Sequence, residues 1–188
     1  MDLKNLATVR QSFANTVFTH KVQEVAVEHQ EQKSFWVKII NIILVSLVLI
    51  FLFLQTKYPD NIIFSYIGVG ITISEIIFLV IQLTFSFEQR AISHKNAALK
   101  FLGLRDSYRA LVTDIMNGNI AKKEIIYRRD LLQKEYQIIC ELAPQTGGSE
   151  YTEAQKRLNK KGAVQGEEFT WSDKEIDWFL PEELRLKK

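Results

Sequence analysis

Residues 61–87 read NIIFSYIGVGITISEIIFLVIQLTFSF and contain one charged side chain, Glu75. At about 1.5 Å per residue, a helix of this length crosses a hydrocarbon core of about 30 Å. A second apolar segment, WVKIINIILVSLVLIFLFLQ at 36–55, lies before it and has one charge, Lys38, near its start. The link TKYPD between them contains Pro59 and suits a tight turn. We therefore predict two membrane spans that form a hairpin.

A pair of buried core helices is the alternative interpretation of these two segments. The chain has 188 residues, and outside 37–87 it is highly charged. Too little apolar sequence remains to wrap two such helices, so the sequence favours membrane spans. The link offers only Lys57, whereas both outer flanks carry several Lys and Arg residues. The positive-inside tendency then places both termini in the cytoplasm.

The remaining sequence predicts an all-α protein with four parts. Residues 1–33 have apolar positions at helical spacings and form an N-terminal cytosolic helix. Residues 34–88 hold the hairpin, and 89–143 form a cytosolic helical pair divided by the turn signal NGN at 117–119. The polar, Gly-containing residues 144–188 are a linker and a tail helix, because SDKE at 172–175 has the spacing of a capping box. We expect the N-terminal helix and the helical pair to pack as an antiparallel bundle.

The second span has small or polar residues along one helical face, at alternating steps of four and three. Such a face packs against other helices or lines water when several copies form a ring. A carboxylate at the bilayer centre costs at least about 3 kcal/mol, so Glu75 is either protonated or bonded to a neighbour such as Ser46, or it lies in a conduction path. Both uses need contacts beyond one hairpin, and a path needs a homo-oligomer. The candidate residues of this face are Gly68, Thr72, Glu75, Gln82 and Ser86.

Enzyme motifs are missing from the sequence, and we expect no catalytic activity, metal or cofactor. GVGITI at 68–73 starts like a dinucleotide fingerprint but lacks its third glycine and lies inside a span. His20, Glu24 and Glu28 share one helical face and have side chains that could hold a metal, but a solvated polar surface is the ordinary explanation. The basic residues after the second span lie beside anionic lipid headgroups, so we expect lipid and not nucleic acid to be their partner.

The tail has aromatic residues that need a docking surface. Trp171, Trp178 and Phe179 lie in or beside the predicted terminal helix. They dock on the chain's own bundle, on another subunit or on a separate partner.

After the second span, RAISHKNAALKFLGLRDSYRALVTDI at 90–115 carries a helix motif that includes His94, Phe101, Arg105 and Tyr108. Together with two closely spaced spans, this motif resembles the SLATT family, the SMODS- and SLOG-associating two-transmembrane effector domains of bacterial conflict systems. The resemblance covers about 30–142. It implies that these four residues belong to the cytosolic bundle and its interfaces.

The resemblance also implies a function. Members are membrane effectors of anti-phage systems in which a nucleotidyltransferase, a SLOG-domain protein or a reverse transcriptase is the sensor. On activation they are expected to oligomerise and to form a pore or perturb the inner membrane. The trigger is either a nucleotide second messenger or the sensor protein, and a nucleotide would have to meet basic residues between subunits.

Three alternatives stay open beside this effector. One is a membrane-anchored interaction module that recruits a cytosolic partner and conducts no ions. A transport subunit that uses Glu75 for proton coupling is disfavoured because two spans contain no inverted repeat. An embedded enzyme is disfavoured most.

Overall fold

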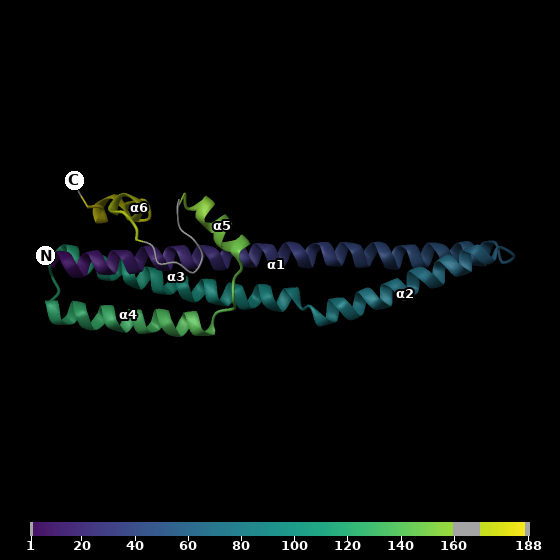
Figure 1. Cartoon of the computed structure of the whole chain (residues 1–188), viewed down its shortest axis with the longest axis horizontal. Coiled ribbons are helices and arrows are strands. Elements are labelled where there is room, and N and C mark those ends of the chain that lie inside the picture. The colour runs from purple at the N-terminus through teal and green to yellow at the C-terminus, as the bar shows by residue number, and fades with distance from the viewer. Residues whose placement is uncertain (1, 160–169, 187–188) are drawn as a thin grey trace. The chain divides into compact units, whose positions relative to one another are not determined.

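The computed structural model describes residues 2–159 and 170–186, and every regular element in these ranges is helical (Figure 1). The all-α class is therefore confirmed. The elements are α1 (Leu3–Lys57), α2 (Ile62–Thr84), α3 (Phe87–Asn117), α4 (Lys122–Leu142), α5 (Gly148–Arg157), α6 (Asp173–Asp177) and the 3₁₀ turn η1 (Glu182–Leu184).

The chain divides into two compact units, which are treated separately below. The body unit combines Met1–Val27 with Ile92–Lys188, and the hairpin unit is Glu28–Ala91. Both α1 and α3 supply residues to both units, because neither helix has a proline that would end it at the boundary. The sequence-based division at 33/34 and 88/89 thus falls within helices and not at their ends.

The hairpin unit holds the two candidate membrane spans. The most apolar 18-residue windows have a mean hydropathy of 2.9 in Leu3–Lys57 and 2.1 in Ile62–Asn117, and none of either window is buried. The apolar side chains of two core helices would be buried by the rest of the protein. Since those of both windows are not, the alternative of two core helices is not supported. Asn61 caps α2, since its side chain accepts a hydrogen bond from the Ile63 amide (3.2 Å).

The second span is shorter than the predicted 61–87. Helix α2 ends at Thr84, and Phe85 has φ −101° and ψ 79° outside helical values. Helix α3 starts at Phe87, and the Phe85 and Phe87 rings stack with centroids 6.3 Å apart. The break contains neither Pro nor Gly, so the sequence pattern does not reveal it. As a result, Ser86 lies outside α2 and the regular stripe stops at Gln82.

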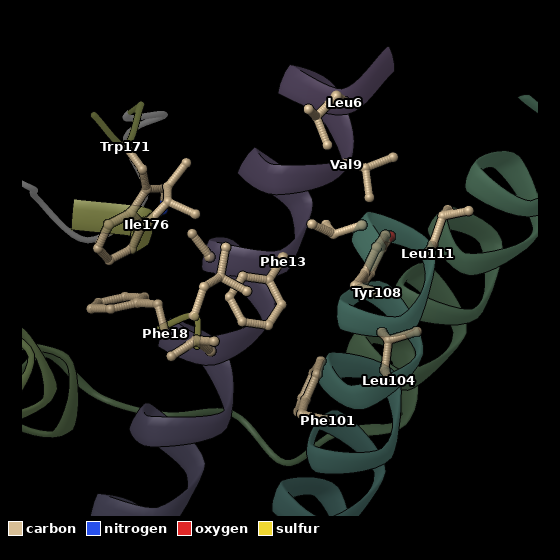
Figure 2. Packing of buried hydrophobic residues seen from close by; sticks show 14 of the residues in the cluster. Leu6, Val9, Phe13, Phe18, Phe101, Leu104, Tyr108, Leu111, Trp171 and Ile176 are labelled. Atoms are coloured by element: carbon tan, nitrogen blue, oxygen red, sulfur yellow. The ribbon is translucent and has the colours of Figure 1, made fainter. Parts of the chain in front are cut away.

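The first part of α1 forms the centre of the body unit (Figure 2). One side of it packs against α3 through positions that alternate by three and four residues, the spacing of helices packed along each other. Phe13 on the same stretch is 1% exposed. The α3 residues in this contact are Phe101, Leu104, Tyr108, Leu111 and Ile115.

Helix α4 completes this side of the body unit. Gly118 adopts φ +70° in the predicted NGN turn, a conformation that glycine reaches without strain. The helix then returns antiparallel to α3 and buries Ile125 and Ile139. It ends at Leu142, shortly before Pro144.

The opposite side of α1 receives the C-terminal elements of the body unit (Figures 1 and 2). Ser172 and Glu175 form the predicted capping box of α6, with the Glu175 carboxylate accepting from the Ser172 amide (2.8 Å). Part of the predicted linker is helical as α5, and its residues 160–169 lie outside the described residues.

Candidate functional site on the inner face of the hairpin

The predicted polar stripe of α2 faces the first span inside the hairpin unit. Gly68, Thr72, Glu75 and Gln82 are half-buried, whereas the residues between them are mostly exposed as membrane-facing positions should be. Gly68 faces the first span, since an added Cβ would lie in ordinary van der Waals contact with the Phe51 Cβ, at 3.5 Å. The stripe therefore lies between the two spans of one chain, and it includes neither the exposed Ser86 nor the lipid-facing side of α2.

Hydroxyl groups in the spans bond within their own helices. Thr72 Oγ1 donates to the Gly68 carbonyl (2.9 Å), and Ser74 Oγ donates to the Gly70 carbonyl (2.9 Å). Ser46 is exposed and donates to the Ile42 carbonyl (2.7 Å). Back-bonding of this kind satisfies a hydroxyl where no water is present. It also uses the proton that Ser46 could have given to Glu75.

Amide side chains in the same unit are not satisfied. The buried Oδ1 of Asn41 and the buried Oε1 atoms of Gln55 and Gln82 have no hydrogen-bond partner among the described residues. Leaving such an atom buried without a partner costs about 1–3 kcal/mol. Asn41 and Gln55 come from α1 and Gln82 from α2, so both spans contribute polar groups that the closed hairpin leaves without partners.

Glu75 is half-buried on the same inner face, but its oxygens are not fully buried as those of the amides are. The described part of the chain offers its carboxylate neither an ion pair nor a hydrogen bond. The hairpin interior thus has a row of one carboxyl and several amide oxygens that would gain from water or from a second polar partner.

A hollow opens next to this row, near the link between the spans. Its volume is about 190 Å³. Gly68 is part of its wall. The lining includes Val48, Phe51, Gln55, Phe64, Gly68 and Thr72.

The other end of the hairpin unit is closed by a salt bridge. Lys38 pairs with Glu88, and Ser34 Oγ also lies 3.5 Å from Glu88 Oε1. The hydrogen bond and charge of Lys38 hold the pKa of Glu88 below its ordinary value. Both partners are largely exposed, so this pair adds little to stability. It does fix which residues face each other where the two helices leave the apolar region.

The bundle residues named by the helix motif have different environments in the body unit. Phe101 and Tyr108 are fully buried against α1, and burial raises the pKa of Tyr108 to about 12. His94 is also buried, with Nδ1 2.7 Å from Gln23 Oε1. The Gln23 amide then donates to the Pro144 carbonyl (3.3 Å), which connects α3, α1 and the end of α4. Arg105 is near the surface, where it binds Asp106 (3.0 Å).

The tail residues lie on the chain's own body unit, but not all of them dock. Trp171 is 3% exposed and its Nε1 donates to Asn15 Oδ1 (2.7 Å). Phe179 packs edge-on against Trp171 with centroids 5.8 Å apart. Trp178 is 71% exposed, and Ile176 takes the buried position in its place.

Sequence reasoning missed the polar contacts that hold the tail. Arg10 is fully buried; it donates to Asp177 Oδ1 (2.6 Å) and to the Leu184 carbonyl (3.1 Å). Gln11 bonds both the carbonyl (2.6 Å) and the amide (2.9 Å) of Trp171. The sequence did contain a signal for this contact. Arg10 lies in phase with the apolar stripe of the N-terminal helix, which predicts that its guanidinium is buried and therefore has an acidic partner.

The predicted solvated face around His20 is also different in the structure. His20 is 8% exposed, and its Nε2 lies 3.7 Å from Glu24 Oε1. Glu24 pairs in turn with Lys21. In the described residues, no three His, Cys, Asp or Glu side chains are grouped as metal ligands would be.

Comparison with known families gives one match that covers most of the chain. The model of the SMODS and SLOG-associating 2TM effector domain family 4 matches residues 6–175. The match begins near the start of α1, includes α2 to α5 and reaches into α6. Neither the comparison with curated proteins nor that with solved structures found a match.

Proposed function

The chain belongs to the SMODS and SLOG-associating two-transmembrane effector domain family 4, a family of conflict-system membrane effectors, and from this membership we propose that it disrupts the bacterial inner membrane. In this proposal an associated sensor detects phage and activates the protein. The activated chains oligomerise and form a pore or otherwise make the membrane leak, which halts the infected cell.

The observation that carries this proposal is the set of polar groups without partners inside the hairpin. Asn41, Gln55 and Gln82 each have a buried amide oxygen with no hydrogen bond among the described residues, and Glu75 lies on the same inner face. A protein that needed only an anchor would gain stability from apolar residues at these positions. Retaining them is understandable if the closed hairpin is a resting state, because separation of the spans gives these groups water.

The proposed pore requires several copies. Two helices cannot enclose an aqueous path, so inner faces from several chains must together line it. In the resting hairpin the polar face of α2 is turned toward α1, and activation would turn it toward the axis of the ring. The hollow beside Gly68 leaves room for the two spans to shift against each other.

The partners in this proposal are membrane lipids, further copies of the chain and a sensor. The sensor is a nucleotidyltransferase, a SLOG-domain protein or a reverse transcriptase, acting directly or through a nucleotide second messenger. We place both termini in the cytoplasm on the distribution of basic residues. The protein needs no cofactor and catalyses no reaction in this mechanism.

Membrane potential tests the proposal. The protein is induced in bacteria loaded with a voltage-sensitive dye, together with its sensor if the chain alone is silent, beside a Glu75→Leu variant. Ser74→Leu is the matched control, because Ser74 is the neighbouring residue on the exposed side of α2 and bonds only its own helix. We expect depolarisation by the parent and by Ser74→Leu, and a loss of it in Glu75→Leu at equal expression and membrane insertion.

Other outcomes of this experiment are equally clear. Depolarisation by all three proteins keeps the effector but removes Glu75 from the conduction path. A sealed membrane in cells that the parent protein arrests contradicts the proposal and favours the interaction module. Trp178, which is 71% exposed on the tail, is the feature that such a module would present to a partner.

A further inference from the structure

A second hollow in the hairpin unit lies at the end away from the link between the spans. It is formed by α1 and the first residue of α3, and its volume is about 330 Å³. Small-molecule sites commonly have volumes of about 300–1,000 Å³. None of the residues around it belongs to the polar row between the spans. The hollow is lined by His29, Gln32, Lys33, Trp36, Val37 and Phe87.

This lining changes from polar to apolar in the direction of the membrane. Gln32 and Lys33 come just before the apolar segment that starts at Trp36, and Phe87 is the last residue of the second apolar run. The place where both helices leave the hydrocarbon lies at the level of the lipid headgroups, where tryptophan rings are enriched. We call this space the interfacial hollow, because its polar end lies among headgroups and its apolar end among acyl chains.

The polar side chains of the interfacial hollow offer hydrogen-bond donors. The Lys33 ammonium and the Trp36 indole can only donate, and the Gln32 amide can donate as well. All three side chains are exposed, and among the described residues none of them has a hydrogen bond or an ion pair. A ligand that suits them has acceptor oxygens and a negative charge, as a phosphodiester does.

Three carboxylates near this part of the chain lie outside the lining. Glu88 is bound by Lys38, which lies about 140° around α1 from Lys33. Glu31 comes two residues before Lys33 and thus points about 160° away from it around the helix. Glu28 comes five residues before Lys33, about 7.5 Å farther from the apolar segment. The positive charge at the polar end of the hollow is therefore left for an anion from outside the chain.

We propose that the interfacial hollow binds one anionic phospholipid, with its phosphate at Lys33 and an acyl chain along the apolar wall. The Gln32 amide and the Trp36 indole donate to the phosphate or to the ester oxygens next to it. Val37 and Phe87 contact the start of the acyl chain. A phospholipid fits because its own order of groups, charged head first and hydrocarbon next, is the order of the lining.

The bound lipid joins the two helices where they leave the membrane. Both α1 and α3 line the hollow, so the lipid bridges them on one flank, while Lys38 and Glu88 join them on another. In the proposed function the two contacts together hold the resting hairpin closed. Lipid binding rests on that function only through the placement of this end in the cytoplasmic leaflet, and it needs neither an oligomer nor a pore.

Lysine and aromatic residues at span ends also act as anchors that select no particular lipid. Lys57 at the other end of α1 has such an arrangement, with its Nζ 5.3 Å from the centre of the Tyr58 ring. A lysine beside an aromatic residue thus ends the apolar segment on both sides. Lys57 is therefore the matched control for Lys33, because its loss removes the same charge from the same helix.

Native mass spectrometry of the full-length chain in a mild detergent tests the site. The protein is titrated with dioleoyl phosphatidylglycerol or with dioleoyl phosphatidylcholine, which has the same acyl chains but no net charge. We expect the parent to retain its first phosphatidylglycerol at a several-fold lower concentration than its first phosphatidylcholine. Lys33→Gln should raise the concentration needed for phosphatidylglycerol about fivefold, the most that a partly exposed ion pair contributes, and Lys57→Gln should leave it unchanged.

Two further readings complete the experiment. Retention of phosphatidylcholine should be the same in the parent and in both lysine variants, which shows that Lys33→Gln is folded. Phe87→Ala should weaken the retention of both lipids alike, because it removes part of the wall along the acyl chain and none of the charge.

Contrary results are as specific. Equal retention of the two lipids by the parent, or an equal loss in Lys33→Gln and Lys57→Gln, overturns the site in favour of general attraction at span ends. Displacement of the lipid by an equal concentration of glycerol 3-phosphate overturns it in favour of a soluble phosphate ligand. If cells depolarise but the purified chain selects no lipid, the site fails and the proposed function stands. Selective retention by a chain that never depolarises cells supports the site and contradicts the proposed function.

Discussion

At the scale of single residues, one guanidinium holds two distant parts of the body unit together. Arg10 on α1 is fully buried, and its partners Asp177 and Leu184 lie at the other end of the chain. Breaking a buried ion pair by removing one partner leaves the other charge poorly solvated. The tail is thus held by specific bonds in addition to the apolar contacts of Trp171 and Ile176.

Replacing Arg10 should release the tail and destabilise the body unit. We expect Arg10→Leu to lower the free energy of unfolding by about 3 kcal/mol, because Asp177 loses its partner in a largely buried position. Arg10→Lys should retain only part of the stabilisation that Arg10 provides, since one lysine ammonium cannot replace the two nitrogens with which Arg10 bonds the Asp177 carboxylate and the Leu184 carbonyl. Thermal unfolding in detergent and limited proteolysis of the tail measure the effect. Equal stability of Arg10→Leu and the parent would show that apolar packing alone holds the tail.

His20 should make the body unit sensitive to mild acid. Burial is the main cause that lowers its pKa from the ordinary 6.5; Arg105 and Lys21 act in the same direction, and Glu24 and Asp106 oppose them. The unfolded chain therefore binds a proton at a higher pH than the folded chain does. Stability is complete above about pH 6.5 and falls as the pH drops below that value.

His20→Gln tests this dependence directly. The amide keeps a polar group in the pocket but takes up no proton, so the decline in the thermal midpoint between about pH 6.5 and 5 should become shallower. The measurement compares parent and variant at each pH in the same detergent. An unchanged decline in the variant would assign the acid sensitivity to carboxylates instead.

At the scale of elements, the sequence predicted those helices whose apolar positions repeat over many turns. Two candidate spans, the Phe101–Ile115 repeat and the capping box at Ser172 all follow from local pattern. The break at Phe85 does not, because neither Pro nor Gly marks it and the apolar run continues through it. An uninterrupted run predicts that a span exists more reliably than where it ends.

For the polar face of α2 at the candidate site, the sequence likewise predicted one feature and not another. Its spacing predicted which residues share a face, and Gly68, Thr72, Glu75 and Gln82 do lie together on the half-buried side. The sequence could not show which neighbour this side faces, since packing partners depend on the tertiary arrangement. Nor could it show that hydroxyls such as that of Ser46 bond their own helix while the amides of Asn41 and Gln82 stay unsatisfied.

At the scale of the whole molecule, the two candidate functions differ in what they ask of the hairpin. An interaction module needs the hairpin only to hold the body unit at the membrane. An effector needs this particular hairpin, with its row of buried polar groups, because the leak passes through it. Family membership and the unsatisfied amides of the hairpin both favour the effector.

Exchange of the hairpin separates these functions. Residues 36–84 are replaced by an unrelated, wholly apolar two-span hairpin of equal length, and the body unit is left unchanged. We expect the exchanged protein to reach the membrane, but no longer to arrest growth or depolarise cells on activation. A second exchange that restores Asn41, Glu75 and Gln82 in the foreign hairpin should recover part of the leak if these side chains carry it. Growth arrest that survives the first exchange would mean that the body unit acts through a partner, because the hairpin would then serve only as an anchor.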